Sequence, residues 1–352
     1  MGIPSITEVF GLSQKQTEIL YNFEMLKVQA DIKADKMPKD HDLKEKWLTN
    51  WKKEIAEFFQ KSFVINWYED DYKLFEEIKK EYDNQPNNLW YDLVLLEAEI
   101  FQPYVSAAKE FKGLKYKNNK WLEFVVSQQN LVGNDFLKQI KKVYQKSINQ
   151  MRGTTKNIAI AALATTTLAA LTAVGGALFA PGIAVALVGT DFTGLSGIAL
   201  TNAALAYLGG GAIAVGGYGV AGGTAVIAGG GALLGLTAGT SVSASSIVVS
   251  NVLYQPNENL HQTAKIVVVV KTLLANKRKD IKLAQKVQNS LEDNIKLLQH
   301  SLIDLDGKED KEKIKEIQKS ITQMQRALKD ITKFLSAYGL GVNKEEEGFS
   351  DF

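Results

Sequence analysis

Three histidines are the side chains of this sequence best suited to metal binding or to acid–base catalysis near neutral pH. They stand at His41, His261 and His300, far apart in the chain, and none belongs to an HExxH or similar metal-binding spacing. Cysteine is absent, which removes thiol catalysis and disulfide bonds. The sequence therefore predicts no metal site, no cofactor and no enzyme activity.

Glycine motifs that bind nucleotides are not supported either. The glycine-rich stretch between Gly175 and Gly239 contains no lysine, so a phosphate-binding GxxxxGK[ST] loop is missing. Matches to GxGxxG, such as Gly217, Gly219 and Gly222, are expected by chance in such a stretch, and no acidic residue follows at the ribose-reading distance. With 39 acidic and 41 basic residues, the charge balance also gives no case for nucleic-acid binding.

The dominant feature is a long block with almost no charge. From Asn157 to Asn257 the only charged side chain is Asp191, and 19 of the 28 glycines lie between Gly175 and Gly239. The runs on either side of Asp191 contain 34 and 66 uncharged residues. Because a helix crosses a bilayer with about 20 apolar residues, these lengths predict a membrane-inserting block of two to four spans.

Glycines recur in this block at a four-residue spacing that begins at Gly211. Such a row places small residues along one helical ridge and lets helices approach closely in lipid. The alternative is a buried pair of glycine-rich helices in a soluble protein. We predict that the row packs membrane helices through Gly211, Gly219, Gly223, Gly231, Gly235 and Gly239.

Basic residues flank the block on both sides. By the positive-inside rule both flanks belong on one face of a membrane, which requires an even number of crossings and favours two. Asp191 is then expected at the far turn of the hairpin, with a functional carboxylate inside the membrane as the alternative. The predicted membrane-flanking cations are Lys142, Lys146, Arg152 and Lys156 before the block and Lys265 and Lys271 after it.

Residues 1–125 form an aromatic-rich region that contains all five tryptophans. Apolar residues at three- and four-residue spacing predict helices there, including one over residues 89–111. The region is expected to be a compact helical domain, with an interfacial or ligand-binding surface as the alternative. Residues 126–156 are predicted to be a basic amphipathic region, most of which belongs to one long helix from Trp121 to Met151.

Residues 258–340 are predicted to be a coiled-coil helical hairpin, followed by a disordered tail over residues 341–352. Its first arm is expected to be a continuous helix from Gln262 to Leu305, about 65 Å long at about 1.5 Å per residue. The second arm carries a strict three-four apolar alternation, which is typical of a coiled-coil seam. Pairing within the chain and pairing between subunits are both open for this seam, which consists of Ile314, Ile317, Ile321, Met324, Leu328 and Ile331.

These elements predict an all-α protein, an elongated helical bundle with a coiled-coil hairpin and a central glycine-rich apolar membrane hairpin. This order resembles the α-helical pore-forming proteins of the cytolysin A type and the related multi-component bacterial enterotoxins, over roughly residues 121–338. The resemblance implies a helical bundle that shelters an apolar head and inserts it as subunits assemble into a ring. The tract AYLGGGAIAVGGYGVAGGTAVIAGGGALLG also looks like the glycine-rich hairpins of bacterial membrane-associated proteins.

The expected function is therefore membrane permeabilisation, as a toxin or as a cell-suicide effector against phage. The alternative is a resident integral membrane protein with a cytoplasmic helical scaffold or sensor domain. The expected partners are a lipid bilayer and either further copies of the chain or a companion helical subunit, but no nucleic acid. We expect a membrane-associated protein with a soluble precursor form, cytoplasmic or secreted without a cleavable signal.

Overall fold

The computed structural model describes residues 14–35, 37–59, 64–85, 88–104, 109–118, 120–133, 135–153, 256–302 and 311–347. All regular secondary structure in these ranges is helical, which confirms the predicted all-α class. Most of the apolar block lies outside the described residues. The same holds for three groups of predicted site residues: the packing glycines (Gly211, Gly219, Gly223, Gly231, Gly235 and Gly239), the turn residue Asp191 and the flanking Lys156.

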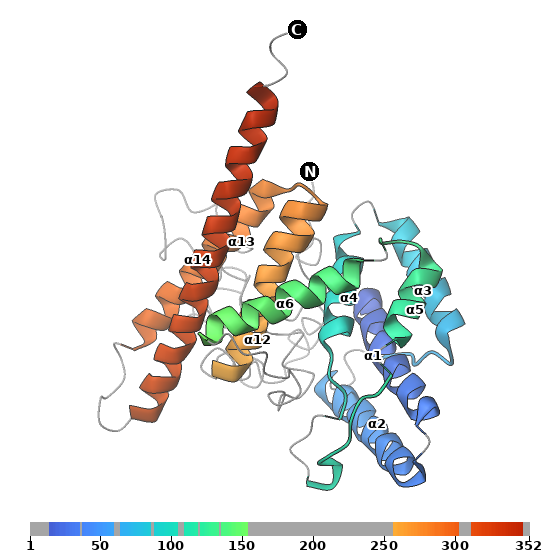
Figure 1. Cartoon of the computed structure of the whole chain (residues 1–352). Helices are drawn as coiled ribbons and strands as arrows, with labels where there is room; N and C mark the ends of the chain where they lie inside the picture. The colour runs from blue at the N-terminus through green and yellow to red at the C-terminus, as the bar shows by residue number, and fades with distance from the viewer. Residues whose placement is uncertain are drawn as a thin grey trace, which may run out of the picture.

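A first group of helices surrounds α1 (Gln14–Ala34), as Figure 1 shows at the blue end of the chain. The helices packed against α1 are α2 (Pro38–Phe59), α3 (Asp71–Asn84), α4 (Leu89–Ile100) and α5 (Trp121–Gln129). Because neighbours cover α1 on several sides, its polar side chains are buried together with its apolar ones. A helix covered in this way has no solvent-facing side, so its charges need partners inside the protein.

Aromatic side chains fill the space between α1, α2 and the end of α4. Trp47 and Trp51 stack with ring centroids 6.0 Å apart, and Tyr21 meets Trp51 edge to face. Tyr104 meets Trp47 in the same way. All four of these side chains are buried. The aromatic residues thus form a core, as expected for a compact helical region.

Two predicted long helices of this region are interrupted. The helix predicted over residues 89–111 ends at Ile100, and a short 3-10 helix, Lys109–Phe111, follows later. Pro103 accounts for the early end, since proline cannot continue the hydrogen-bond pattern of a helix. The single helix predicted from Trp121 to Met151 is also wrong. It is divided into α5 and α6 (Phe136–Arg152), because Asn130 adopts a left-handed backbone conformation with φ 50°.

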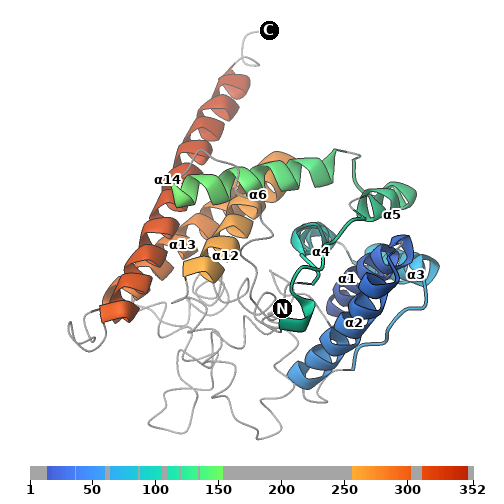
Figure 2. The same cartoon turned by 60° about the horizontal axis from the view of Figure 1, so that its bottom comes forward.

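A second group of helices begins with α6 and resumes after the apolar block. α6 is strongly amphipathic, and its buried face includes Ile140, Tyr144 and Ile148. The remaining members are α12 (Pro256–Val268), the π-helix η6 (Val269–Lys277), α13 (Ile281–Ser301) and α14 (Lys311–Glu347). Figures 1 and 2 show α6 crossing α12 and α14, with α13 alongside α14.

The continuous helix predicted from Gln262 to Leu305 is wrong. The helix first widens into the π-helix η6, and the chain then turns at Lys279, whose backbone is left-handed with φ 57°. The turn is stabilised by backbone hydrogen bonds from Arg278 and Asp280 to carbonyls of η6. α13 therefore starts as a separate helix and packs beside α14. Gln288 of α13 donates a hydrogen bond to the hydroxyl of Thr332 on α14.

The apolar seam of α14 packs within the chain. Ile317, Met324 and Ile331 are fully buried, Ile321 is 7 % exposed, and Ile314 and Leu328 are partly covered. The helices against α14 are α6, α12 and α13, so the seam lies in a bundle of several helices and not in an isolated two-helix hairpin. α14 also continues to Glu347, beyond residue 340, where a disordered tail was predicted to begin. In Figure 1 its last turns project beyond the other helices.

Within the described ranges, no helix combines the length and the apolar character that a membrane crossing requires.

Candidate functional site

The two ends of the apolar block are attached to a pair of helices that contact each other. α6 leads into the block and ends at Arg152, and Gly153 closes it with a left-handed φ of 70°. α12 leads out of the block and begins at Pro256, a residue well suited to the first turn of a helix. α6 and α12 pack directly against each other.

One hydrogen bond joins this pair deep inside the protein. The Tyr144 hydroxyl of α6 lies 2.5 Å from Nδ1 of His261 on α12, and both side chains are buried. His261 lies five residues after Pro256 and Tyr144 eight residues before Arg152. At about 1.5 Å per helical residue, the end of α6 and the start of α12 therefore lie within about 12 Å of helix from this bond. We call this pair of helices with its Tyr144–His261 bond the junction.

α14 closes the junction from a third side. Arg326 donates from Nη1 to the carbonyl oxygen of Met151 at 2.8 Å, in the last turn of α6. The positive charge of Arg326 is also stabilised by the negative, C-terminal end of the α6 helix dipole. A Cβ added at Gly153 would lie 2.9 Å from the same nitrogen, so glycine suits both the left-handed backbone and the close approach of Arg326. The C-terminal half of α6, which leads into the apolar block, is thus bonded to both α12 and α14.

His261 is held in its neutral form. Burial lowers its pKa to about 4, and the positive charges of Lys265 and Arg152 act in the same direction. Its Nε2 atom is buried and has no hydrogen-bond partner among the residues that the structure describes. Protonation of His261 would place a third positive charge in a site that already contains two.

The predicted flanking cations divide into two sets. Before the block, Lys142 and Lys146 are exposed on α6, and Arg152 is partly covered. After the block, Lys265 and Lys271 are not exposed. Lys265 pairs with Glu97 of α4, and Lys271 lies 2.5 Å from Asp330 of α14. Their placement differs from the surface position predicted, because α12 and η6 lie among other helices, where each cation needs a carboxylate partner.

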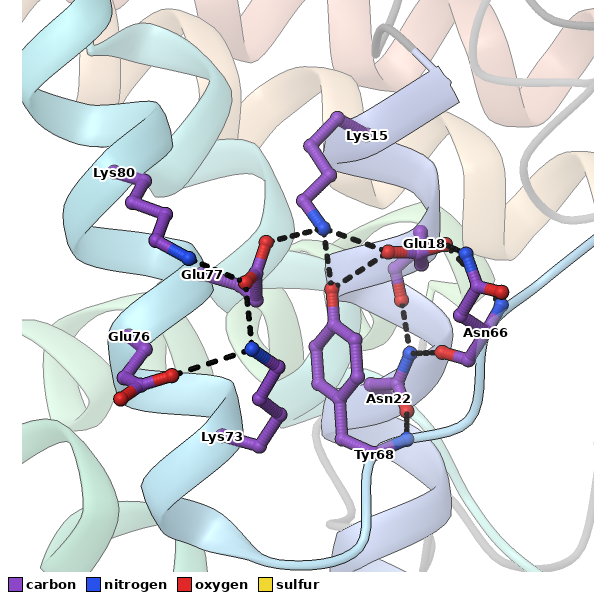
Figure 3. Close-up of polar contacts among 9 residues, drawn as sticks. All are labelled: Lys15, Glu18, Asn22, Asn66, Tyr68, Lys73, Glu76, Glu77 and Lys80. Atoms are coloured by element: carbon purple, nitrogen blue, oxygen red, sulfur yellow. Dashed lines mark hydrogen bonds and ion pairs between the residues drawn. The ribbon is translucent and has the colours of Figure 1, made fainter.

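A second polar site lies between α1, α3 and the segment before α3 (Figure 3), and the sequence patterns did not identify it. Lys15 of α1 lies 2.8 Å from Glu18 and 2.5 Å from Glu77 of α3, and it donates to the hydroxyl of Tyr68 at 3.0 Å. Tyr68 in turn donates to Glu18 at 2.8 Å. Asn22 continues the network, accepting from the backbone N–H of Tyr68 and donating to the carbonyl of Asn66.

The charges of this network satisfy one another. The hydrogen bond from Lys15 lowers the pKa of Glu77 to about 2, and Lys73 and Lys80 contribute further bonds. Although burial alone would lower the pKa of Lys15, its bonds to Glu18, Glu77 and Tyr68 raise it above the ordinary value. A carboxylate with a low pKa beside a lysine with a high pKa is suited neither to accept nor to deliver a proton near neutrality. The network therefore joins α1, α3 and the segment before α3, which contributes Asn66 and Tyr68.

A third set of buried charges faces the second group of helices. Lys27 of α1 donates to the carbonyls of Ala98 and Phe101 at 2.7 and 2.9 Å, which satisfies the C-terminal end of α4. Burial lowers its pKa to about 8. Glu24 lies nearby, and burial together with the charge of Glu97 raises the pKa of Glu24 well above its usual value. Of the two carboxyl groups, Glu97 is the one that pairs with Lys265.

The sequence offered one signal for these buried charges. Polar residues recur along α1 at three- and four-residue spacing, a pattern normally taken as the solvated face of a helix. Only the surrounding helices turn that face inward. Among the described residues no cluster of three or more histidine, aspartate or glutamate side chains could hold a metal ion.

No protein-family model, no curated protein and no solved structure matches the chain.

Proposed function

We propose that this chain is a membrane-inserting protein that permeabilises lipid bilayers, with the apolar block as the inserting part and the helices around it as the support. Such an activity belongs to a toxin or to an effector that kills its own cell in defence against phage. Oligomers form through the glycine row in this proposal. The helical body keeps the block attached on one side of the membrane.

The observation that carries the proposal is the junction. A block of 101 residues with one charge requires an apolar environment, and the helices on either side of it are bonded to each other close to its two ends. A segment that starts and finishes at one place crosses a membrane an even number of times. This supports a hairpin, as the basic flanks of the sequence also do.

Release of a trapped dye from liposomes tests the proposal. Protein purified without detergent should release the dye rapidly and in a concentration-dependent way. A protein that stays in solution without detergent and releases no dye from liposomes of any tested composition would contradict the proposal. Buffer and heat-denatured protein serve as controls for leakage that does not depend on the fold.

A resident integral membrane protein is the second candidate. The run of 66 uncharged residues after Asp191 favours it, because this run alone exceeds the length of a two-helix hairpin, for which about 40 apolar residues suffice. In this case the protein should be recoverable only with detergent and should release no dye. The described helices would then act as a scaffold or sensor next to the membrane.

A further inference from the structure

The two flanks of the apolar block differ in how their cations are placed. On α6, before the block, Lys138 and Lys141 have side chains 67 % and 62 % exposed, and Lys142 and Lys146 are exposed as well. After the block, the side chain of Lys265 is only 7 % exposed and is covered by α4. Before the block the cations are thus exposed, whereas after it Lys265 is covered and Lys277 and Arg278 are partly covered, with side chains 36 % and 24 % exposed.

α4 covers the second flank with carboxylates. Glu97 pairs with Lys265 of α12, and Asp92 pairs with both Lys277 and Arg278 at the end of η6. The Asp92 side chain is 1 % exposed, so its carboxylate is desolvated and its charge is stabilised by these two cations. Figures 1 and 2 show α4 between α1 and the second group of helices, where it contacts η6 and α6.

The π-helix η6 explains how Lys265 and Lys277 can both pair with carboxylates of α4. In an α-helix of about 3.6 residues per turn, a separation of 12 positions would point the side chains of Lys265 and Lys277 about 120° apart. In η6 each N–H bonds to a carbonyl five residues earlier, so each residue turns the helix by a smaller angle. The wider turns bring Lys277 to α4 as well, where it bonds to Asp92. π-helical segments of this kind are frequent at functional sites.

We propose that α4 is a latch over a binding surface for anionic lipid headgroups, and that Lys265, Lys277 and Arg278 form this surface. The inference rests on the proposed membrane insertion. In the latched state, Asp92 and Glu97 occupy the positions that phosphates of the bilayer take after α12 and η6 leave α4. The exchange is between one set of anions and another, so the three cations are paired in both states.

The position of these residues in the chain selects the lipid as the partner. Lys265 follows the first residue of α12 by only nine positions, and the apolar block ends where α12 begins. Cations next to a membrane segment lie at the level of the headgroups and are attracted by anionic lipids.

Binding to vesicles tests the latch without requiring permeabilisation. Asp92→Asn and Glu97→Gln each remove one carboxylate charge from α4. Both variants should bind vesicles of equal parts phosphatidylcholine and phosphatidylglycerol about fivefold more tightly than the parent, since a cation near an anionic surface contributes about 1 kcal/mol. Binding to pure phosphatidylcholine should not change. Co-sedimentation with the vesicles measures both.

Glu110→Gln is the matched control. It removes one negative charge from the same group of helices, but Glu110 lies in an exposed pair with Lys46 that contacts neither α12 nor η6. This variant should bind like the parent. Equal binding by Asp92→Asn, Glu97→Gln and the control, with thermal melting that shows all three folded, would overturn the inference. So would an equal gain on both kinds of vesicle.

Hydrogen exchange on the unaltered protein covers the case in which the α4 variants do not fold. Vesicles that contain phosphatidylglycerol should increase amide exchange in α4, residues 89–100, because α12 and η6 leave it, whereas pure phosphatidylcholine should not. The same exchange in α4 with both lipids would overturn the latch. Dye release measured in parallel separates the two proposals: a protein that binds and opens without release contradicts only the permeabilising function.

Discussion

At the scale of single residues, this protein contains buried charges that are almost all paired. Lys265, Lys44 and Lys27 are each covered by other helices, and each finds carboxylates or carbonyl oxygens in the interior. A buried charge without such partners costs several kcal/mol, so these residues are sensitive positions. His261 differs from these lysines, since burial and two nearby cations keep it neutral.

His261 gives a prediction for acid. Its folded pKa of about 4 lies below the ordinary value of 6.5, so the unfolded chain binds the proton first as the pH falls. Its contribution to stability is complete above pH 6.5 and decreases below it, by about 3 kcal/mol once the pH is below 4. We expect urea midpoints of the parent to fall more steeply over this range than those of His261→Gln.

The matched control for this experiment is His41→Gln, because His41 is partly exposed on α2. Its midpoints should follow those of the parent at every pH. If His261→Gln shows the same pH dependence as the parent, the neutral state of this histidine does not contribute to the stability of the junction.

Asp31 gives a prediction for the first group of helices. Its carboxylate accepts from Lys44 at 2.6 Å, from the Tyr104 hydroxyl at 2.7 Å and from the backbone N–H groups of Lys117 and Asn118. The side chains of Asp31 and Lys44 are both fully buried. Asp31→Ala should lower the free energy of unfolding by about 3 to 5 kcal/mol, because it leaves the Tyr104 hydroxyl and two backbone N–H groups without their acceptor and leaves Lys44 with Asp35 as its one carboxylate partner.

The comparison for Asp31→Ala is Glu110→Ala, which removes a carboxylate that also lies 2.6 Å from a lysine, but at the surface. An exposed pair of this kind is worth about 0 to 1 kcal/mol. Chemical denaturation followed by circular dichroism measures both. Similar losses in the two variants would show that burial of the Asp31–Lys44 pair has no energetic consequence.

At the scale of elements, the helices end where single residues change the backbone. Asn130 and Lys279 are left-handed, and each divides a stretch whose apolar periodicity continues across it. The π-helix η6 is a further local change, which rotates Lys277 toward α4. The helical elements thus direct side chains to partners that regular helices would not reach.

The glycine row is predicted to act as an element in the membrane. Gly223→Leu and Gly231→Leu should abolish dye release from liposomes, because a leucine side chain keeps the helix backbones apart. The far-ultraviolet circular dichroism and the melting temperature of the protein in solution should remain those of the parent. Val215→Leu is the matched control, since Val215 belongs to the same four-residue row and already carries a branched side chain. Release by the glycine variants equal to that of the parent would exclude the packing role.

At the scale of the whole molecule, two groups of helices meet at α4 and enclose the flanks of the apolar block. Buried apolar side chains form one continuous cluster from α1 to α14. The helices that lead into and out of the block belong to the same body, because α6 and α12 are bonded by Tyr144 and His261. The molecule is therefore organised around one point of attachment for the block.

This arrangement predicts the topology after insertion. Both the first group of helices and α14 should stay on the side of the liposome from which the protein was added. Trypsin added outside should digest both after insertion, whereas the apolar block should be protected. Antibodies to tags at the two ends of the chain, used on blots of the digest, measure this. Protection of one end only would show an odd number of crossings.

The sequence by itself determined the helical class, the aromatic region, the buried stripe of α14 and the position of the apolar block. These properties follow from local periodicity and composition, which neighbouring residues determine among themselves. Only the tertiary structure decided that Lys265 meets Glu97, 168 residues away, and that the polar residues of α1 lie inside. The reason is physical: a charged stripe on a helix looks the same in sequence whether water or a carboxylate of a distant helix solvates it. Burial of that stripe depends on the packing of whole helices, which no local pattern encodes.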